Sequence, residues 1–139
     1  MKLKKTIHKC RLLAFKEEKI LVLQKAGFKK ELSLPGGIQK KKETDFHSLI
    51  REVDEEIGVL LKKDELSYFV SRKNITKEKT EVYKHYFVAT RPLKKITLLE
   101  PEKFKRVLWI PWYQALEYMD KEDCSAVAMY CDQFSKAAN

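Results

Sequence analysis

The sequence predicts one domain of mixed α and β structure, and three observations carry this prediction. A segment in the middle of the chain has the apolar periodicity of a helix, whereas segments before and after it alternate as strands do. The chain has 139 residues, 44% of them hydrophobic, which is enough for one sizeable core. It contains no repeat, low-complexity stretch or linker, so we expect a single domain over residues 1–139.

The first part of the chain is predicted to form a strand hairpin. Residues 7–15 and 20–24 are rich in apolar residues and flank the charged turn 16–19. Residues 25–33 are predicted to be a loop. This loop leads to Pro35-Gly36-Gly37, a turn that leaves its backbone exposed to a partner.

The central segment is predicted to be a helix with one buried stripe. At about 100° per residue, five apolar residues fall within a narrow sector: Phe46, Leu49, Ile50, Val53 and Ile57. Thr44 or Asp45 is a plausible N-cap, and Gly58 is a plausible C-terminal stop. Three carboxylates share another side of this helix: Glu52, Glu55 and Glu56.

The carboxylate cluster has two interpretations. Charge runs are usually solvated surface. Clustered carboxylates also repel one another, and a divalent cation removes that repulsion. The turn at residues 35–37 favours the cation, because a backbone carbonyl there can reach the same metal. A bound divalent metal in turn indicates phosphate chemistry.

The second half continues the mixed pattern. Residues 66–72, 82–90 and 107–110 are predicted strands, the last of which ends before Pro111. Residues 112–119 are predicted to begin a short helix, and residues 123–135 to form a terminal helix.

Residues 37–59 resemble the Nudix box, the signature of the Nudix pyrophosphohydrolases. The box reads Gly, five residues, Glu, seven residues, then Arg-Glu-apolar-any-Glu-Glu-any-Gly-apolar. Every fixed position is filled: Gly37, Glu43, Arg51, Glu52, Val53, Glu55, Glu56, Gly58 and Val59. The resemblance implies an α/β/α sandwich with a mixed sheet and a loop–helix–loop catalytic motif. It also implies a Mg²⁺- or Mn²⁺-dependent enzyme that cleaves a nucleoside diphosphate linked to another group.

Site roles follow from the same resemblance. Glu55 and Glu56 would be metal ligands, Glu52 a ligand or the base that activates water, and the Gly36 carbonyl a further ligand. Arg51 and Glu43 would form an ion pair that orients the glutamates. Nudix enzymes often add an acid from the segment before a late strand, which would be Glu102 or Glu100 here, with Glu81 a poorer candidate. Exposed loop acids are the alternative for all three.

The box departs from the common pattern at its loop. Many relatives have glycine immediately before the first box glutamate, where this chain has Lys42, so the backbone of the loop is expected to differ locally. The run of lysines at 40–42 is either solvated surface or a group that attracts polyphosphate. Four aromatic residues could stack on a base, although core packing is the alternative for each: Phe28, Tyr83, Tyr86 and Phe87.

The substrate is less determined than the reaction. Residues 74–77 lack the proline that resembles ADP-ribose hydrolases and the tyrosine that resembles diadenosine polyphosphate hydrolases. This leaves nucleoside triphosphates or other nucleotide conjugates, and antimutator-type enzymes are similar in length and pattern. An RNA 5′-end pyrophosphohydrolase is an alternative, because 29 basic against 20 acidic residues give a charge of +9. A non-catalytic nucleotide sensor and an isomerase on this fold are further alternatives.

Composition also bears on location. Cys10, Cys124 and Cys131 are odd in number and show no metal-pair spacing, which favours reduced thiols and a cytoplasmic protein. The basic residues 1–9 lack the apolar stretch of a signal peptide. No segment approaches the length of a membrane span, so no membrane partner is expected. The oligomeric state is left open.

Overall fold

The computed structural model describes residues 5–138, with side chains described as far as residue 133. Residues 1–4 and 139 of the predicted domain lie outside the described residues. Seven of the described strands and helices have the order β1 (Lys5–Leu13), β2 (Phe15–Lys16), β3 (Lys19–Lys25), β4 (Leu32–Ser33), β5 (Gly36–Ile38), α1 (Asp45–Ile57) and β6 (Leu66–Ile75). They are followed by β7 (Thr80–Ala89), β8 (Phe104–Pro111), α2 (Trp112–Ala115) and α3 (Lys121–Ala138), with 3₁₀ turns η1 (Lys63–Glu65) and η2 (Leu116–Tyr118).

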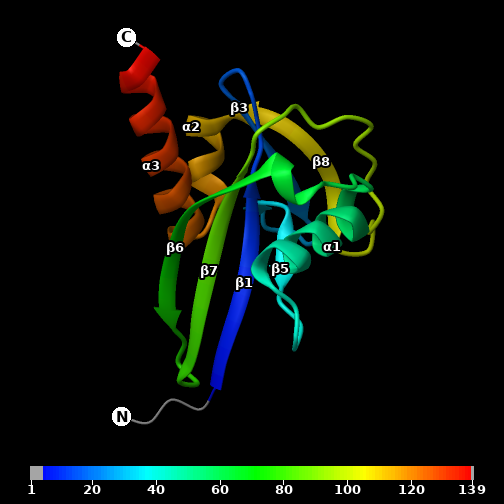
Figure 1. The fold of residues 1–139 in the computed structure, drawn as a ribbon, viewed down its shortest axis with the longest axis vertical. Helices are drawn as coiled ribbons and strands as arrows, with labels where there is room; N and C mark the ends of the chain where they lie inside the picture. Colours follow the sequence, from blue (N-terminus) through cyan, green and yellow to red (C-terminus); the bar gives the residue numbers. More distant parts are fainter. Residues whose placement is uncertain (1–4, 139) are drawn as a thin grey trace.

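The strands form two sheets. The first has the order β5-β1-β7-β6, in which β1 and β7 are parallel and the other pairs are antiparallel. The second has the order β2-β3-β4, with β8 antiparallel to β3. The mixed sheet lies between α1 on one side and α3 on the other (Figure 1). The predicted α/β/α sandwich with a mixed sheet is therefore confirmed.

Strand alternation separates two cores. Leu12 of β1 and Phe87 of β7 pack with Leu49, Val53 and Ile57 of α1. Their sequence neighbours, Leu13 and Tyr86, point to the opposite face and pack with Ala126, Val127 and Cys131 of α3. Because β1 and β7 are covered on both faces, consecutive residues can both be buried, which explains why these strands contain unbroken apolar stretches.

Helix α1 begins and ends close to its predicted limits. The Thr44 hydroxyl accepts a hydrogen bond of 3.2 Å from the His47 N–H, so Thr44 is the N-cap and Asp45 the first helical residue. Gly58 adopts φ 67°, and its N–H donates to the Asp54 carbonyl. This left-handed C-cap is the conformation for which glycine is favoured.

Several predicted limits were wrong, two of them where pairing between distant segments decides the structure. The predicted loop 25–33 contains strand β4, because Leu32 and Ser33 pair with β3. The predicted strand 107–110 is longer, since β8 begins at Phe104 and pairs along β3. The predicted helix 112–119 is split into α2 and the turn η2. Helix α3 starts at Lys121, ahead of the predicted 123, and the Asp120 carboxylate accepts a hydrogen bond from the Asp123 N–H.

All three cysteines are free, and Cys10 and Cys131 are buried in opposite cores. Over residues 5–138, the structure contains no helix with the length and apolar character needed to cross a membrane.

The packing of α1 can be tested with Leu49→Ala. Leu49 is fully buried, so the cavity should lower the free energy of unfolding by about 2–5 kcal/mol. The measurement is urea denaturation followed by circular dichroism. Leu60→Ala is the matched control, because Leu60 is 75% exposed and should change stability by less than about 0.5 kcal/mol. Equal effects of the two substitutions would contradict this assignment of the core.

Candidate functional site

Strand β5 brings the backbone of Gly36 to helix α1. The Leu12 N–H donates to the Pro35 carbonyl and the Gln39 N–H donates to the His8 carbonyl, so alternate residues of this segment pair with β1. Gly36 lies between them and opposite Arg11, at a non-hydrogen-bonded position of the ladder, so its N–H does not donate to β1. Its N–H instead donates a 2.8 Å hydrogen bond to Glu56 Oε1. This bond joins the edge of the sheet to the last turn of α1.

Two adjacent glycines make this approach possible. Gly36 has φ 141°, and a Cβ there would lie 1.9 Å from the Cys10 carbonyl oxygen. A Cβ on Gly37 would lie 2.4 Å from the carboxyl carbon of Glu52. Both contacts are shorter than atoms can tolerate. Gly36 therefore lets β5 lie against β1, and Gly37 leaves space for the Glu52 carboxylate.

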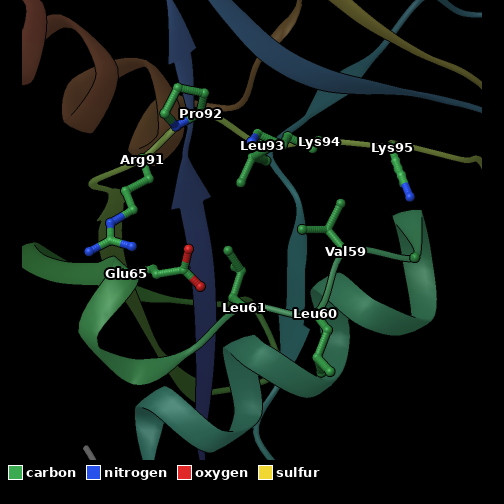
Figure 2. A pocket seen from close by; sticks show the side chains of 10 residues that line it. Val59, Leu60, Leu61, Glu65, Arg91, Pro92, Leu93, Lys94 and Lys95 are labelled. Atoms are coloured by element: carbon green, nitrogen blue, oxygen red, sulfur yellow. The ribbon is translucent and has the colours of Figure 1, made fainter.

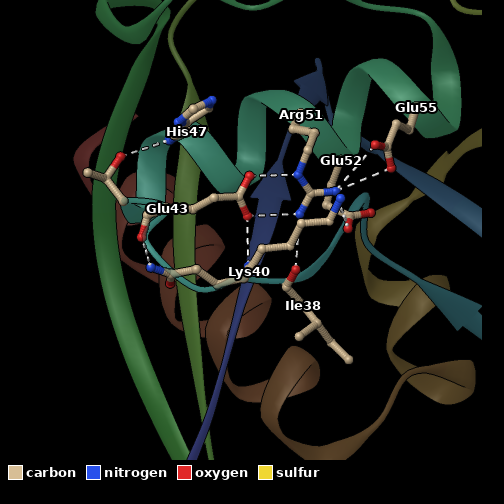
Figure 3. Close-up of polar contacts among 9 residues, drawn as sticks. Ile38, Lys40, Glu43, His47, Arg51, Glu52 and Glu55 are labelled. Carbon is tan, nitrogen blue, oxygen red and sulfur yellow. Dashed lines mark hydrogen bonds and ion pairs between the residues drawn. The ribbon is translucent and has the colours of Figure 1, made fainter.

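Arg51 is the centre of a polar network (Figure 3). It binds Glu43 through two bonds, Nε to Oε2 at 2.7 Å and Nη2 to Oε1 at 3.0 Å. Nη1 donates to Glu52 Oε1 at 2.9 Å and lies 3.3 Å from Glu55 Oε2. Nη2 also donates to the Ile38 carbonyl at 3.1 Å. One guanidinium thus connects the box loop, the end of β5 and two of the helix glutamates.

Glu43 is held in place from both sides. Besides Arg51, the Lys40 N–H donates to Glu43 Oε1 at 2.7 Å. The hydrogen bonds from Arg51 are the main reason that the pKa of Glu43 falls to about 2. The same contacts raise the pKa of Arg51. The pair is therefore ionised throughout the neutral range.

The three helix glutamates occupy different environments. Glu56 is 5% exposed, and its burial raises its pKa to about 8, although the Gly36 N–H acts in the opposite direction. The side chain of Glu52 is 17% exposed and bound to Arg51. The side chain of Glu55 is 48% exposed. Asp54 is exposed and does not take part in the Arg51 network, as its position on the helix predicts.

Glu52 and Glu56 line one cleft of about 330 Å³ together with Gly36 and Gly37. Four cationic residues line the same cleft: Lys9, Arg11, Lys25 and Lys103. The Nε atom of Arg11 is shielded from solvent and has no hydrogen-bond partner among the residues described. The cleft shares Arg11, Lys25 and Ser33 with a second cavity of about 320 Å³. Lys29, Lys30, Tyr118 and Asp120 line this second cavity.

Sequence reasoning missed these four cations. Lys9 and Arg11 are separated by one residue in a strand, so alternation could have placed them on one face. Lys25 ends β3, and Lys103 precedes β8 in a different part of the chain. Only the pairing of these strands brings the four together.

The donor set suits a hydrated Mg²⁺. This ion usually takes one or two protein carboxylates and keeps several water molecules. Within the described part of the chain, no three acidic or other metal-ligating side chains form a ready-made site. Two carboxylates and the Gly36 backbone do meet at the cleft, and Glu56 is buried there without a cationic ion-pair partner in that part of the chain.

The three candidates for an outer acid are placed differently. Glu100 is one of the charges that raise the pKa of Glu56, and it pairs at 3.2 Å with Lys103 of the cleft. Glu102 is exposed and does not line the cleft. Glu81 pairs at 2.9 Å with Lys73 on the β6–β7 hairpin.

The four candidate aromatic residues differ in their burial and location. Tyr86 and Phe87 are buried in the two cores, and Tyr83 stacks on His8. Phe28 is fully exposed in the loop whose lysines, Lys29 and Lys30, line the second cavity. The lysines at 40–42 are exposed and line a separate cavity with His8.

Comparison with known proteins places these features in a family. Residues 9–129 match the model of the NUDIX domain. Among solved structures, the E. coli ORF135 protein has a TM-score of 0.78 at 18% identity, covering 92% of this chain and 90% of that one. The MutT protein from Methanosarcina mazei Go1 has a TM-score of 0.73 at 16% identity, with coverages of 95% and 98%.

A C. elegans Ap4A hydrolase has a TM-score of 0.67 at 16% identity, with coverages of 94% and 98%. At these identities the solved structures show a shared fold. The sequence has no match among curated proteins.

The loop departure at Lys42 generates a stability prediction. Lys42 adopts φ 71°, a left-handed conformation that glycine adopts without strain. Lys42→Gly should therefore raise the free energy of unfolding by up to about 1 kcal/mol, after allowing for the extra flexibility of glycine. The control is Lys41→Gly at the neighbouring residue, where φ is negative and the substitution should be destabilising. Urea denaturation measures the free energy of unfolding of both variants. A loss of stability in Lys42→Gly would contradict the proposal that Lys42 is strained.

The burial of Glu56 predicts a pH dependence in metal-free protein. Because its pKa rises from 4.5 to about 8 on folding, its stabilising contribution is present below about pH 4.5 and is lost as the pH rises to about 8. Glu56→Gln keeps an oxygen for the Gly36 N–H and should not show this loss. Its advantage over the natural chain should therefore grow up to about pH 8. The test is the free energy of unfolding measured in EDTA across this pH range, with Glu55→Gln as the control. If the free energy of Glu56→Gln changes with pH in parallel with that of the natural chain, the prediction is refuted.

Proposed function

Because the NUDIX domain spans most of its length, this chain belongs to the Nudix family of pyrophosphohydrolases, and on that premise we propose a Mg²⁺-dependent nucleotide pyrophosphohydrolase. The substrate is a nucleoside diphosphate linked to another group, foremost a nucleoside triphosphate or a related nucleotide. The observation that carries the proposal is the cleft in which Glu52 and Glu56 lie among four cationic residues. Carboxylates suit a hard metal ion, and surrounding cations suit the phosphates that the ion binds.

The metal, Mg²⁺ or Mn²⁺, would be held by Glu52, Glu55, Glu56 and the Gly36 carbonyl. When bound, such an ion neutralises phosphate charge and lowers the pKa of water. Glu55 pairs with Arg51 and does not line the cleft, so its part in binding requires a different side-chain position. As an additional acidic residue we favour Glu100 over the Glu102 of the sequence analysis, because Glu100 is electrostatically linked to Glu56 and paired with Lys103.

The residues of the chain have distinct tasks in this proposal. Glu52 accepts the proton of the attacking water or binds the metal, while Arg51 fixes one of its oxygens. Arg51 is itself fixed by Glu43, so the orientation of Glu52 depends on the box loop. Lys9, Arg11 and Lys25 line the cleft and neutralise the charge of the pyrophosphate.

The nucleoside would occupy the second cavity. That cavity continues from the cleft through Arg11, Lys25 and Ser33, so one molecule can reach both. Tyr118 and Asp120 also line it, and Phe28 is exposed on the neighbouring loop. Lys30 lies over the Tyr118 ring and Asp120 pairs with Lys84, so a base would stack on Tyr118 by displacing Lys30, or on Phe28.

An RNA 5′ end is the second candidate substrate, favoured by the +9 charge and the cationic residues along the cleft. The free cysteines support the proposal that the protein is cytoplasmic. A panel of nucleoside triphosphates, nucleotide conjugates and triphosphorylated RNA, assayed by phosphate and pyrophosphate release with product identification, separates the candidate substrates. Tight nucleotide binding without turnover on any of them, with Mg²⁺ or Mn²⁺, would instead favour a non-catalytic sensor.

The catalytic assignment is tested with Glu55→Gln and Glu56→Gln. Each should lower the rate of nucleotide hydrolysis by about 10²-fold or more, because a lost metal ligand removes several kcal/mol of charge stabilisation. Asp54→Asn is the matched control, since Asp54 is on the same helix but exposed and outside the cleft. Full activity in both glutamine variants would overturn the assignment.

A further inference from the structure

A separate cavity of about 450 Å³ lies at the C-terminal end of α1. It is formed between the segment 58–61 with Glu65 on one side and the segment 91–95 on the other. It shares no lining residue with the cleft or with the second cavity. Its size is within the range of small-molecule sites, and the proposed hydrolysis makes no use of it.

The floor of this cavity is apolar and belongs to the core. Val59 is 8% exposed and Leu61 5% exposed, and both belong to the core under α1. Leu93 packs against the same core. Figure 2 shows Leu61 and Leu93 directed toward each other across the cavity, with Leu60 pointing away from it. A ligand that enters would therefore meet a fixed apolar surface.

The rim of the cavity is cationic. Arg91, Lys94 and Lys95 are exposed, and none of them forms a hydrogen bond or ion pair with another residue in the part of the chain that the structure describes. Figure 2 places Arg91 at one end, beside Glu65, and Lys95 at the other. The carboxylate of Glu65 already accepts a hydrogen bond from the Lys62 N–H. Three cations against one carboxylate leave the rim positive.

We propose that this cavity is a second ligand site, which binds a small amphipathic anion through its apolar floor and its cationic rim. The apolar body of the ligand would cover Val59, Leu61 and Leu93. Its phosphate or carboxylate would take hydrogen bonds from Arg91 and the two lysines, which are stronger than bonds between neutral groups. An anion without an apolar body would remain hydrated at the rim, and an apolar molecule without charge would lose the rim contacts.

The site is physically connected to the catalytic helix. Downstream of Lys95, the Thr97 N–H donates to the Ile57 carbonyl and the Leu99 N–H donates to the Glu56 carbonyl, both at 2.9 Å. The same segment continues to Glu100, which pairs with Lys103 of the cleft. An occupant that moves residues 91–95 therefore acts on the segment that supports the backbone of Glu56.

The probe for this site is hexyl phosphate, with inorganic phosphate and hexanol as its two separate halves. Titrations of isotope-labelled protein are followed by amide chemical shifts, so no hydrolytic activity is needed. Hexyl phosphate should shift the amides of residues 58–61 and 91–95. Inorganic phosphate should shift only the cleft, and hexanol should bind at least about tenfold more weakly than the whole ligand. Shifts confined to the cleft with hexyl phosphate would overturn the site.

Variants make the test specific. The double change Arg91→Glu and Lys94→Glu should weaken hexyl phosphate binding at residues 58–61 at least about tenfold, while Lys77→Glu at an exposed turn should not change it. Both variants alter exposed side chains, and their spectra verify that the fold is kept. Equal affinities would refute the role of the rim. Shifts that fail to reach Thr97 and Leu99 would refute the connection to α1.

Discussion

The bond between the Gly36 N–H and Glu56 is the constraint on which the site depends. It holds a carboxylate of α1 at the edge of the mixed sheet, in a place where burial alone would exclude it. The bond can form only because Gly36 has no side chain to collide with β1. Gly37 leaves room in the same way for Glu52. The positions of α1, β5 and these two acids thus depend on two residues that have no side chain.

The second support is the guanidinium of Arg51. A planar group with several donors can bind one carboxylate with two bonds and still reach others, which a lysine ammonium does less well. Here it links Glu43 of the loop to Glu52 of the helix. The loop therefore has a defined position even though Lys42 must adopt a left-handed conformation within it. Together the two supports join the box loop, β5 and α1 in one network of hydrogen bonds.

Sequence reasoning succeeded where the signal is local. The apolar stripe from Phe46 to Ile57 and the caps at Thr44 and Gly58 define α1 to within a residue or two. It failed where distant segments meet, because the two residues of β4 have no periodicity of their own and form a strand only by pairing with β3. Tyr86 and Phe87 look alike in sequence, yet they are buried on opposite faces of β7. The spacing of the box predicts the type of reaction. Only strand pairing shows which lysines line the cleft.

The location of the glutamates along α1 has an electrostatic consequence. Glu52, Glu55 and Glu56 occupy its last two turns, toward the end where the helix dipole is negative, and no basic residue lies in the last turn. Carboxylates are disfavoured at that end, so the helix raises the energy of its own acidic face. The divalent cation proposed above would offset this penalty. Because it would bind the folded chain and not the unfolded one, its binding would also stabilise the fold. The concentration of free metal would then set the folded fraction of this protein as well as its rate of hydrolysis.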